Sequence, residues 1–177
     1  MGKVFLITGE KAEGKTSFLV AVIQLLKAAN INCWGFYSKG WWKNNIRSGF
    51  DLVSINDESH LTLCTKDPNP EWIKLGPYFF NPEAITFAEE LLKKPPSHSQ
   101  LLVIDEVGKL ELQKKIWYNS IHKLIKRHNQ DMIWCVREKF VTDILDAFNV
   151  EHYTIYNIRH AEPLFVSGEI IKYLSQK

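Results

Sequence analysis

The chain has 177 residues, and its 22 Lys and Arg residues against 20 Asp and Glu residues leave a formal net charge of 22 − 20 = +2. A length of this order fits one domain, so we expect a single folded unit over residues 1–177. The balanced charge gives no long-range field, which argues against a protein that holds nucleic acid or an anionic membrane mainly by bulk electrostatics and leaves a local basic patch open.

The sequence shows no targeting or membrane segment. Its longest apolar run, residues 18–23, is far shorter than the ~20 residues of a membrane-spanning helix. No basic stretch feeds an apolar segment at the N-terminus, so we expect a cytoplasmic protein without membrane contact. The cysteines are odd in number, lie far apart and form no C-x-x-C pair, which predicts reduced and mostly buried thiols at Cys33, Cys64 and Cys135.

The chain begins with a predicted strand, a loop and a helix. Residues 4–8 form a short apolar run with β-branched members, which predicts a buried strand. Apolar side chains recur at helical spacing over residues 15–29, which predicts a helix. Between them, residues 9–16 read G-E-K-A-E-G-K-T and fit G-x-x-x-x-G-K-S/T, the pattern of a phosphate-binding P-loop.

The P-loop pattern assigns a role to each part of this turn. The glycines let successive backbone N–H groups and the positive end of the helix face a phosphate chain. We expect Lys15 to reach the β- and γ-phosphates, Thr16 to offer its hydroxyl to Mg²⁺, and Ser17 to touch the α-phosphate. The side chains of Glu10 and Glu13 are expected to point into solvent. The predicted nucleotide-binding residues are Gly9, Glu10, Lys11, Ala12, Glu13, Gly14, Lys15, Thr16 and Ser17.

After the first helix the pattern becomes β-like. Turn-rich pieces, including an Asn-Asn pair at residues 44–45, join these short runs. They predict a β-rich insert at about residues 32–80, a hairpin or meander. Trp41 and Trp42 lie near its expected tip, where they could stack on a base, dock a partner or fold back onto the sheet. The β-like runs are residues 33–37, 49–55 and 60–64.

A second motif follows the insert. A helix is predicted at residues 84–94, ended by two prolines, and a buried strand at residues 101–104 runs directly into two acids. After a P-loop, Asp105 is placed to hold the shell of Mg²⁺ through water. Glu106 lies one residue beyond and is placed to accept a hydrogen bond from an attacking water and aim it at the γ-phosphate.

The rest of the chain alternates between helices and strands. Such alternation predicts an α/β fold with three layers and a mostly parallel sheet. The predicted elements are helices at residues 113–128, 141–148 and 168–174 and strands at residues 132–136 and 153–156.

Two classes of P-loop protein are disfavoured. GTP switches read guanine with N/T-K-x-D, which the sequence lacks, although residues 105–108 spell D-x-x-G. Partitioning-type ATPases carry a lysine directly after the first glycine, where this chain has Glu10. The glutamate that follows Asp105 favours hydrolysis by water instead.

Four segments resemble a family of small P-loop nucleoside-triphosphatases that includes thermophilic enzymes and the human cancer-related nucleoside-triphosphatase. The most specific is residues 104–112, I-D-E-V-G-K-L-E-L, which is similar to the family's I-D-E-I-G-K-M-E-L. The others are the P-loop, residues 35–37 with 47–51 (G-F-Y and R-S-G-F-D), and residues 75–83 (L-G-P-Y-F-F-N-P-E). The chain departs from the family at Trp42, where an arginine is common, and at residues 157–163, which read as if one residue were inserted.

This resemblance implies a fold and an activity. The fold would be a RecA-like P-loop core with an inserted β-hairpin. The activity would be slow, Mg²⁺-dependent hydrolysis of ATP, GTP, CTP and UTP to the diphosphate. Such hydrolysis needs a cation near the γ-phosphate, because the transition state spreads charge over its oxygens. Lys109 and Arg47 are favoured because both lie in segments that resemble the family, and the other candidates are Arg137 and Arg159.

Two other function classes stay open. The first alternative is a regulatory or binding ATPase whose nucleotide state controls an RNA, DNA or protein partner. The second is a kinase for a small molecule or nucleotide. Nucleic acid is not expected as the main substrate, and the oligomeric state is left open.

Overall fold

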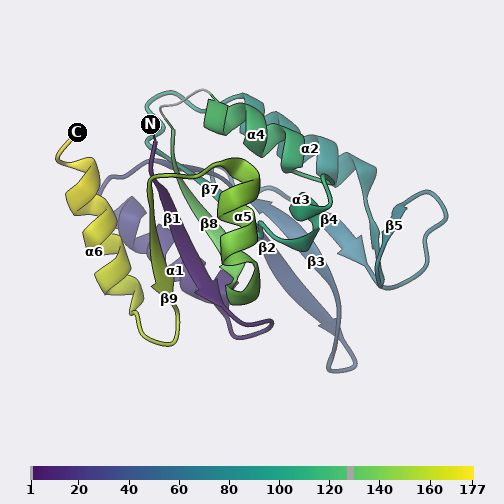
Figure 1. Ribbon diagram of the computed structural model, residues 1–177. Helices are drawn as coiled ribbons and strands as arrows, with labels where there is room; N and C mark the ends of the chain where they lie inside the picture. The colour runs from purple at the N-terminus through teal and green to yellow at the C-terminus, as the bar shows by residue number, and fades with distance from the viewer. Residues whose placement is uncertain (1, 127–129) are drawn as a thin grey trace.

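The computed structural model describes residues 2–126 and 130–177 (Figure 1). Its strands are β1 (Val4–Gly9), β2 (Cys33–Lys43), β3 (Ile46–Ser54), β4 (His60–Thr65), β5 (Ile73–Leu75), β6 (Tyr78–Phe80), β7 (Leu101–Asp105), β8 (Asp131–Arg137) and β9 (Tyr153–Asn157). Its helices are α1 (Lys15–Ala28), α2 (Pro82–Lys93), α3 (Lys109–Leu112), α4 (Tyr118–Lys126), α5 (Val141–Phe148) and α6 (Pro163–Leu174), with a 3₁₀ turn at Glu138–Phe140.

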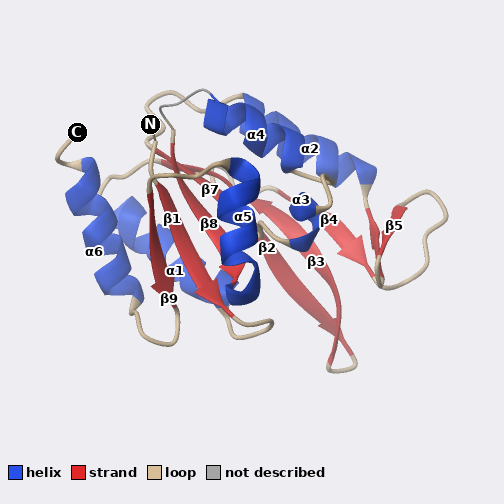
Figure 2. Ribbon diagram, viewed as in Figure 1, coloured by secondary structure: helices blue, strands red, loops and turns tan. Residues whose placement is uncertain are grey.

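The nine strands within the described residues form one sheet, in the order β5-β6-β4-β3-β2-β7-β8-β1-β9. The five strands from β2 to β9 run parallel, whereas β3, β4, β6 and β5 extend the sheet in antiparallel pairs. Helices α1 and α6 cover one face, and α2, α4 and α5 cover the other (Figure 2). The predicted three-layer α/β fold is confirmed, with an antiparallel extension beside the parallel strands.

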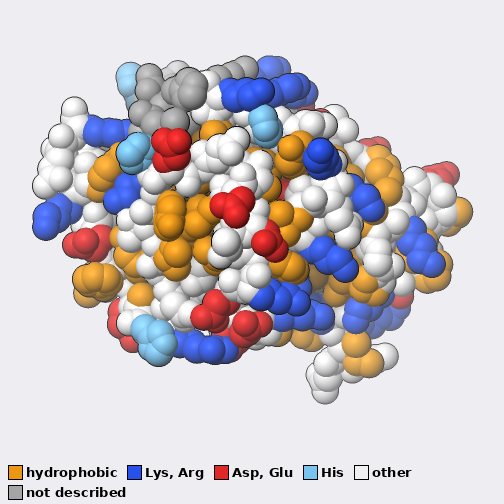
Figure 3. Space-filling model, in the orientation of Figure 1, with side chains coloured by type: hydrophobic (Ala, Val, Ile, Leu, Met, Phe, Trp, Pro, Cys, Tyr) orange, Lys and Arg blue, Asp and Glu red, His pale blue; other side chains and the backbone are white. Residues whose placement is uncertain are grey.

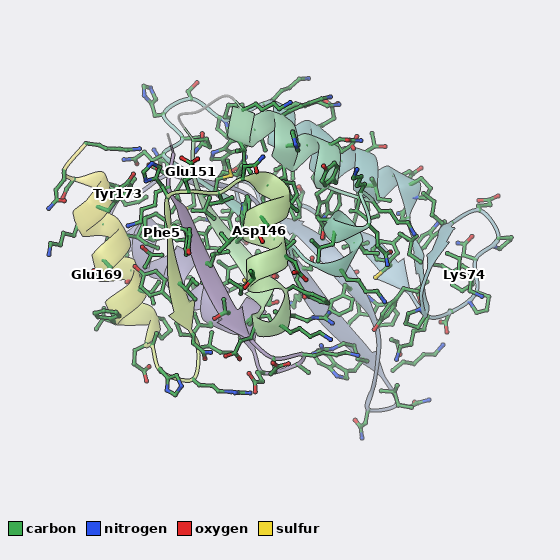
Figure 4. The ribbon with its side chains drawn as sticks, viewed as in Figure 1. Phe5, Lys74, Asp146, Glu151, Glu169 and Tyr173 are labelled. Carbon is green, nitrogen blue, oxygen red and sulfur yellow. The ribbon has the colours of Figure 1, made fainter. Side chains whose placement is uncertain are left out.

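Apolar side chains on alternate positions of β1 supply the two cores, because successive residues of a strand point to opposite faces. Leu6 belongs to the core under α5, and Phe5 and Ile7 belong to the core under α1 and α6. Phe5 meets Tyr173 of α6 edge to face, with ring centroids 5.5 Å apart (Figure 4). The three cysteines are buried and free, as predicted.

The hairpin of β2 and β3 turns at Asn44 and Asn45, whose φ angles of 52° and 59° lie in the left-handed region. Such angles at both central residues are typical of the turn that matches the twist of a two-stranded ribbon, and asparagine tolerates them well. The structure therefore confirms the predicted turn, and its strands are longer than the sequence pattern indicated.

Two predicted helices have different bounds. The helix expected at residues 113–128 is α4, which begins only at Tyr118 and is preceded by the short α3. Lys114 and Ile116 have φ angles of 58° and 50°, so a continuous helix cannot pass through them. The expected end of that helix lies outside the described residues. The last helix begins at Pro163 rather than 168, because proline fits the first turn of a helix.

The parallel strands place the site. The carboxyl ends of β1, β7 and β8 lie at one edge of the sheet, the lower edge in Figure 1. Ligands of open α/β sheets bind at such an edge, because loops and helix N-termini converge there. Charged side chains of both signs lie along this edge (Figure 3).

Candidate active site

The P-loop joins β1 to α1 at this edge. Gly9 ends β1, and an added Cβ there would come within 2.8 Å of the Ile158 side chain. Gly14 precedes α1 with a φ of 97°, a conformation that strains residues with a Cβ. The sequence pattern therefore reflects two local needs, a close contact at the first glycine and a left-handed turn at the second.

Lys15 lies within the loop rather than in solvent. Lys15 is only 7% exposed, and its Nζ donates hydrogen bonds to the carbonyl oxygens of Gly9 (3.0 Å) and Glu10 (2.7 Å). These bonds hold the ammonium group over the turn whose N–H groups would face phosphates. The predicted contact of Lys15 with the β- and γ-phosphates stays a prediction.

Glu13 is an exposed residue, as predicted, but its carboxylate turns back to contact the loop and Arg159. One oxygen of its carboxylate accepts a hydrogen bond from the N–H of Glu10 at 2.7 Å, and the other pairs with the Arg159 guanidinium. The hydrogen bond from Arg159 also lowers the pKa of the Glu13 carboxyl. The reason is local, because a carboxylate three residues along can satisfy a loop N–H that has no other partner in the turn.

Asp105 ends β7 directly opposite the start of α1. Its Oδ2 accepts hydrogen bonds from the Thr16 hydroxyl at 2.8 Å and from the Ser38 N–H at 3.1 Å. Burial, together with the smaller effect of the neighbouring charge of Glu106, raises the pKa of the Asp105 carboxyl to about 6. A cation bound beside it would favour the ionised form, so this carboxyl suits a place next to a metal ion.

Glu106 is the next residue, and its carboxylate meets an arginine. The distance from Arg137 Nε to Glu106 Oε1 is 2.7 Å, and that from Arg137 Nη2 to Glu106 Oε2 is 3.4 Å. Both side chains are about one third exposed, at 31% for Arg137 and 35% for Glu106. The acid expected to orient water is thus held in a two-pronged ion pair at the surface of the site.

A pocket of about 260 Å³ brings the two motifs together. Its walls come from the P-loop, the end of β7 and the β2–β3 hairpin. Motif reasoning missed the hairpin residues Ser38 and Lys39, which follow the G-F-Y segment of β2 without a pattern of their own. The lining residues are Ala12, Gly14, Lys15, Thr16, Ser17, Ser38, Lys39, Gly40, Trp42, Arg47, Phe50, Asp105 and Glu106.

Arg47 forms part of the hairpin wall. Its guanidinium carbon lies 4.8 Å from the ring centroid of Trp42 and 5.4 Å from that of Phe50. Its Nε is buried and has no hydrogen-bond partner among the described residues. Trp42 is 57% exposed, whereas Trp41 folds back against Gly49. The two tryptophans therefore have different environments, and the ring beside the pocket is Trp42.

Lys109, the other favoured cation, begins α3 and is exposed. It does not line the pocket that holds Lys15 and Glu106. Glu111 on the same short helix is buried, and its Oε2 accepts a hydrogen bond from the N–H of Gly108 at 2.7 Å. This bond fixes the loop that follows Glu106, so Glu111 helps to shape the site although it does not line the pocket.

The buried Glu111 predicts a pH-dependent stability. Burial raises the pKa of its carboxyl from 4.5 to about 8, so between these pH values the folded protein binds more protons than the unfolded chain. Folding stability contributed by this group therefore falls as pH rises from about 5 to 8, by at most ~1.4 kcal/mol per pH unit. Glu111→Gln should gain free energy of unfolding relative to wild type as pH rises, measured by urea denaturation at pH 5, 6.5 and 8.

The control for this measurement is Glu90→Gln on α2, since Glu90 is exposed and makes only surface ion pairs. A difference between Glu111→Gln and wild type that stays constant from pH 5 to 8 would contradict the raised pKa.

The donor set at the pocket suits a divalent cation that is shared with phosphates. No group of three or more His, Cys, Asp or Glu that could hold a metal occurs within residues 2–126 and 130–177. Thr16 and Asp105 instead offer a hydroxyl and a carboxylate beside the P-loop. Mg²⁺ is commonly bound by one or two such protein oxygens together with water and substrate phosphates. The residues present therefore fit this ion.

Comparison with known proteins identifies the family. The model of an NTPase family matches residues 4–167. The chain belongs to this NTPase family. Nucleoside-triphosphatase THEP1 of Thermotoga maritima is 24% identical to this chain, and the match covers 96% of this chain and 94% of the THEP1 chain. THEP1 of Sulfolobus acidocaldarius is 31% identical over 67% of this chain and 68% of its own length.

Solved structures share the fold of the NTPase. The human cancer-related nucleoside triphosphatase matches with a TM-score of 0.74 at 20% identity and covers 100% of this chain and 99% of its own. THEP1 of Aquifex aeolicus matches with a TM-score of 0.70 at 18% identity, over 97% of this chain and 98% of its own. The resemblance recognised in the four sequence segments is thus confirmed. None of the helices in the described part of the NTPase is long and apolar enough to cross a membrane.

Proposed function

We propose that this protein is a cytoplasmic, Mg²⁺-dependent nucleoside-triphosphatase that converts ATP, GTP, CTP and UTP to the diphosphate and phosphate. The proposal rests on one observation above all. The P-loop and the acids that end β7 line one pocket and are joined there by the hydrogen bond from Thr16 to Asp105. Residues 1–177 would act as one unit, with the β2–β3 hairpin forming one wall of the pocket.

Phosphate binding would fall to the P-loop. Backbone N–H groups between Gly9 and Ser17, together with the positive end of α1, would neutralise the phosphate chain. Lys15 would exchange its bonds to two loop carbonyls for bonds to the β- and γ-phosphates. A near-neutral protein can hold a highly charged ligand in this way, because the donors are local. Recognition by backbone groups also favours tolerance of the base, since no part of this cradle contacts it.

Thr16 and Asp105 would hold Mg²⁺, Thr16 by its hydroxyl and Asp105 through water. When bound, the ion would neutralise charge on the β- and γ-phosphates and fix their orientation. The hydrogen bond from the Ser38 N–H would keep the Asp105 carboxylate in place during this binding.

Glu106 would direct the water. Its carboxylate accepts a hydrogen bond from a water, whose oxygen forms a bond to the γ-phosphorus. The bond from that phosphorus to the β,γ-bridging oxygen breaks, and its electron pair stays with the nucleoside diphosphate. One water proton passes to Glu106 and then to solvent. The slow turnover implied by the family resemblance stays part of this proposal.

Arg47 is supported as a charge-stabilising group by its place in the pocket wall and by its buried Nε, which has no partner in the described ranges. Lys109 keeps only the support of the sequence resemblance, because it lies outside the pocket lining. A guanidinium aimed at developing charge contributes more beside apolar rings than in open water, and Arg47 lies beside the rings of Trp42 and Phe50.

The proposal predicts phosphate release from all four nucleoside triphosphates in the presence of Mg²⁺. Release should fall to the uncatalysed level when EDTA removes the metal and should return when Mg²⁺ is added in excess. The measurement is inorganic phosphate and nucleoside diphosphate over time for each substrate. Turnover that persists in EDTA would contradict the metal dependence, and activity on one base only would contradict the tolerance. Phosphate that appears on an added acceptor rather than free would indicate a kinase, and a several-fold rise with RNA, DNA or a protein would indicate a regulatory ATPase.

A further inference from the structure

Arg137 lies between the two nucleotide motifs. It ends β8, the strand between β1 and β7, and its neighbour across the sheet in β1 is Gly9, the first residue of the P-loop. On the other side, β8 pairs with β7 as far as Asp105. The topology thus places one arginine at the centre of the edge where the γ-phosphate and the attacking water would meet.

The contacts of Arg137 join it to one of these motifs. Its guanidinium engages both oxygens of Glu106, at 2.7 and 3.4 Å, and has no other hydrogen-bond partner in the described part of the chain. About a third of each side chain is exposed, so the pair lies at the surface rather than in the core. Glu106 lines the pocket, and Arg137, which is not among the lining residues, is joined to the pocket through its contact with Glu106. An ion pair that is exposed to this extent can be exchanged at low cost, because solvent already screens it.

We propose that Arg137 is a further catalytic residue, which leaves Glu106 for the γ-phosphate when a nucleoside triphosphate binds. The inference rests on the proposed function. The planar guanidinium fits two phosphate oxygens as well as it fits a carboxylate, and the γ-phosphate carries more charge than Glu106. The exchange frees the carboxylate of Glu106 to accept a hydrogen bond from water. Binding of the correct substrate therefore assembles the catalytic pair.

The other cations of this edge have different surroundings. Arg159 pairs with Glu13 of the P-loop, and Arg47 is held between two aromatic rings. Arg137 alone among these arginines touches the acid that would orient water. A diphosphate lacks the group that draws Arg137 away, so after product formation the arginine returns to Glu106. The protein would thus distinguish substrate from product through this residue.

The test compares nucleotide affinity and turnover in Arg137→Gln, Arg137→Lys and the control Lys139→Gln. Lys139 is an exposed cation two residues along the chain, and among the described residues Glu106 pairs with Arg137 and not with Lys139. With Mg²⁺ present, the wild type should bind AMP-PNP, a non-hydrolysable ATP analogue, more tightly than ADP. Arg137→Gln should lower kcat about 100-fold and reduce the preference for the analogue roughly tenfold or more. Arg137→Lys should recover part of kcat and part of the preference for the analogue, because lysine keeps the positive charge but cannot donate two parallel hydrogen bonds as a guanidinium does. Lys139→Gln should match the wild type in both quantities.

Each other outcome identifies what fails. Unchanged kcat in Arg137→Gln would overturn the inference while leaving the proposed function intact. A higher kcat in Arg137→Gln would show that the ion pair only restrains Glu106. A lower kcat with the preference for the analogue retained would show that Arg137 only positions Glu106. Either result overturns the inference. Absence of phosphate release by the wild type would instead refute the proposed function itself.

Discussion

Glu106→Gln is expected to reduce kcat by roughly 10²- to 10⁴-fold, the range lost with a general base. Glutamine has nearly the shape of glutamate but cannot take a proton from water, so the geometry of the β7 end is kept. Affinity for Mg²⁺ and nucleotide should change little, since the P-loop, Thr16 and Asp105 supply the contacts. The measurement is steady-state phosphate release together with the Kd for AMP-PNP.

The matched control is Glu138→Gln, which makes the same change at an exposed carboxylate near the same edge. It should keep the wild-type kcat. If Glu106→Gln turns over as fast as this control, the role assigned to Glu106 is wrong.

Lys15→Ala should lower kcat/KM at least about 10²- to 10³-fold through loss of both phosphate affinity and transition-state charge stabilisation. Lys15 is the cation that the P-loop itself holds over the turn, by bonds to the carbonyls of Gly9 and Glu10. No arginine in the described part of the chain can replace it without moving from its present partner or stacking site. Titration of the variant with AMP-PNP and Mg²⁺ measures the loss of affinity.

Lys123→Ala on the exposed face of α4 is the control, and it should bind nucleotide as the wild type does. Thermal unfolding of both variants shows whether either change disturbs the fold. A folded Lys15→Ala protein with wild-type nucleotide affinity would rule out the P-loop as the phosphate site.

The parts of the site that come from one continuous segment could be predicted from sequence. A P-loop is local, because Gly14 takes a left-handed φ and its neighbours donate their own N–H groups. The acids after β7 follow from the same logic, since the end of a buried parallel strand places Asp105 at the edge. The Asn-Asn turn of the hairpin is local as well.

Contacts between distant segments could not be predicted in the same way. The pairing of Arg137 with Glu106 depends on β8 lying beside β7, and no spacing in the sequence encodes that order. The interaction of Glu13 with Arg159 joins residues that are 146 positions apart. The predicted bounds of α4 were wrong for a different reason. Residues 113–117 have the apolar spacing of a helix, but two of them have left-handed backbone angles. Tertiary packing overrode the local preference there.

The most direct test of the central claim is a single-turnover experiment in water enriched in oxygen-18, with Mg²⁺, ATP and excess protein. If Glu106 directs water to the γ-phosphorus, the released phosphate will carry one solvent oxygen and the ADP none, and Glu106→Gln will bind ATP but release labelled phosphate at least about 100-fold more slowly. Label in the ADP, or labelled phosphate released by Glu106→Gln at the wild-type rate, would contradict the account.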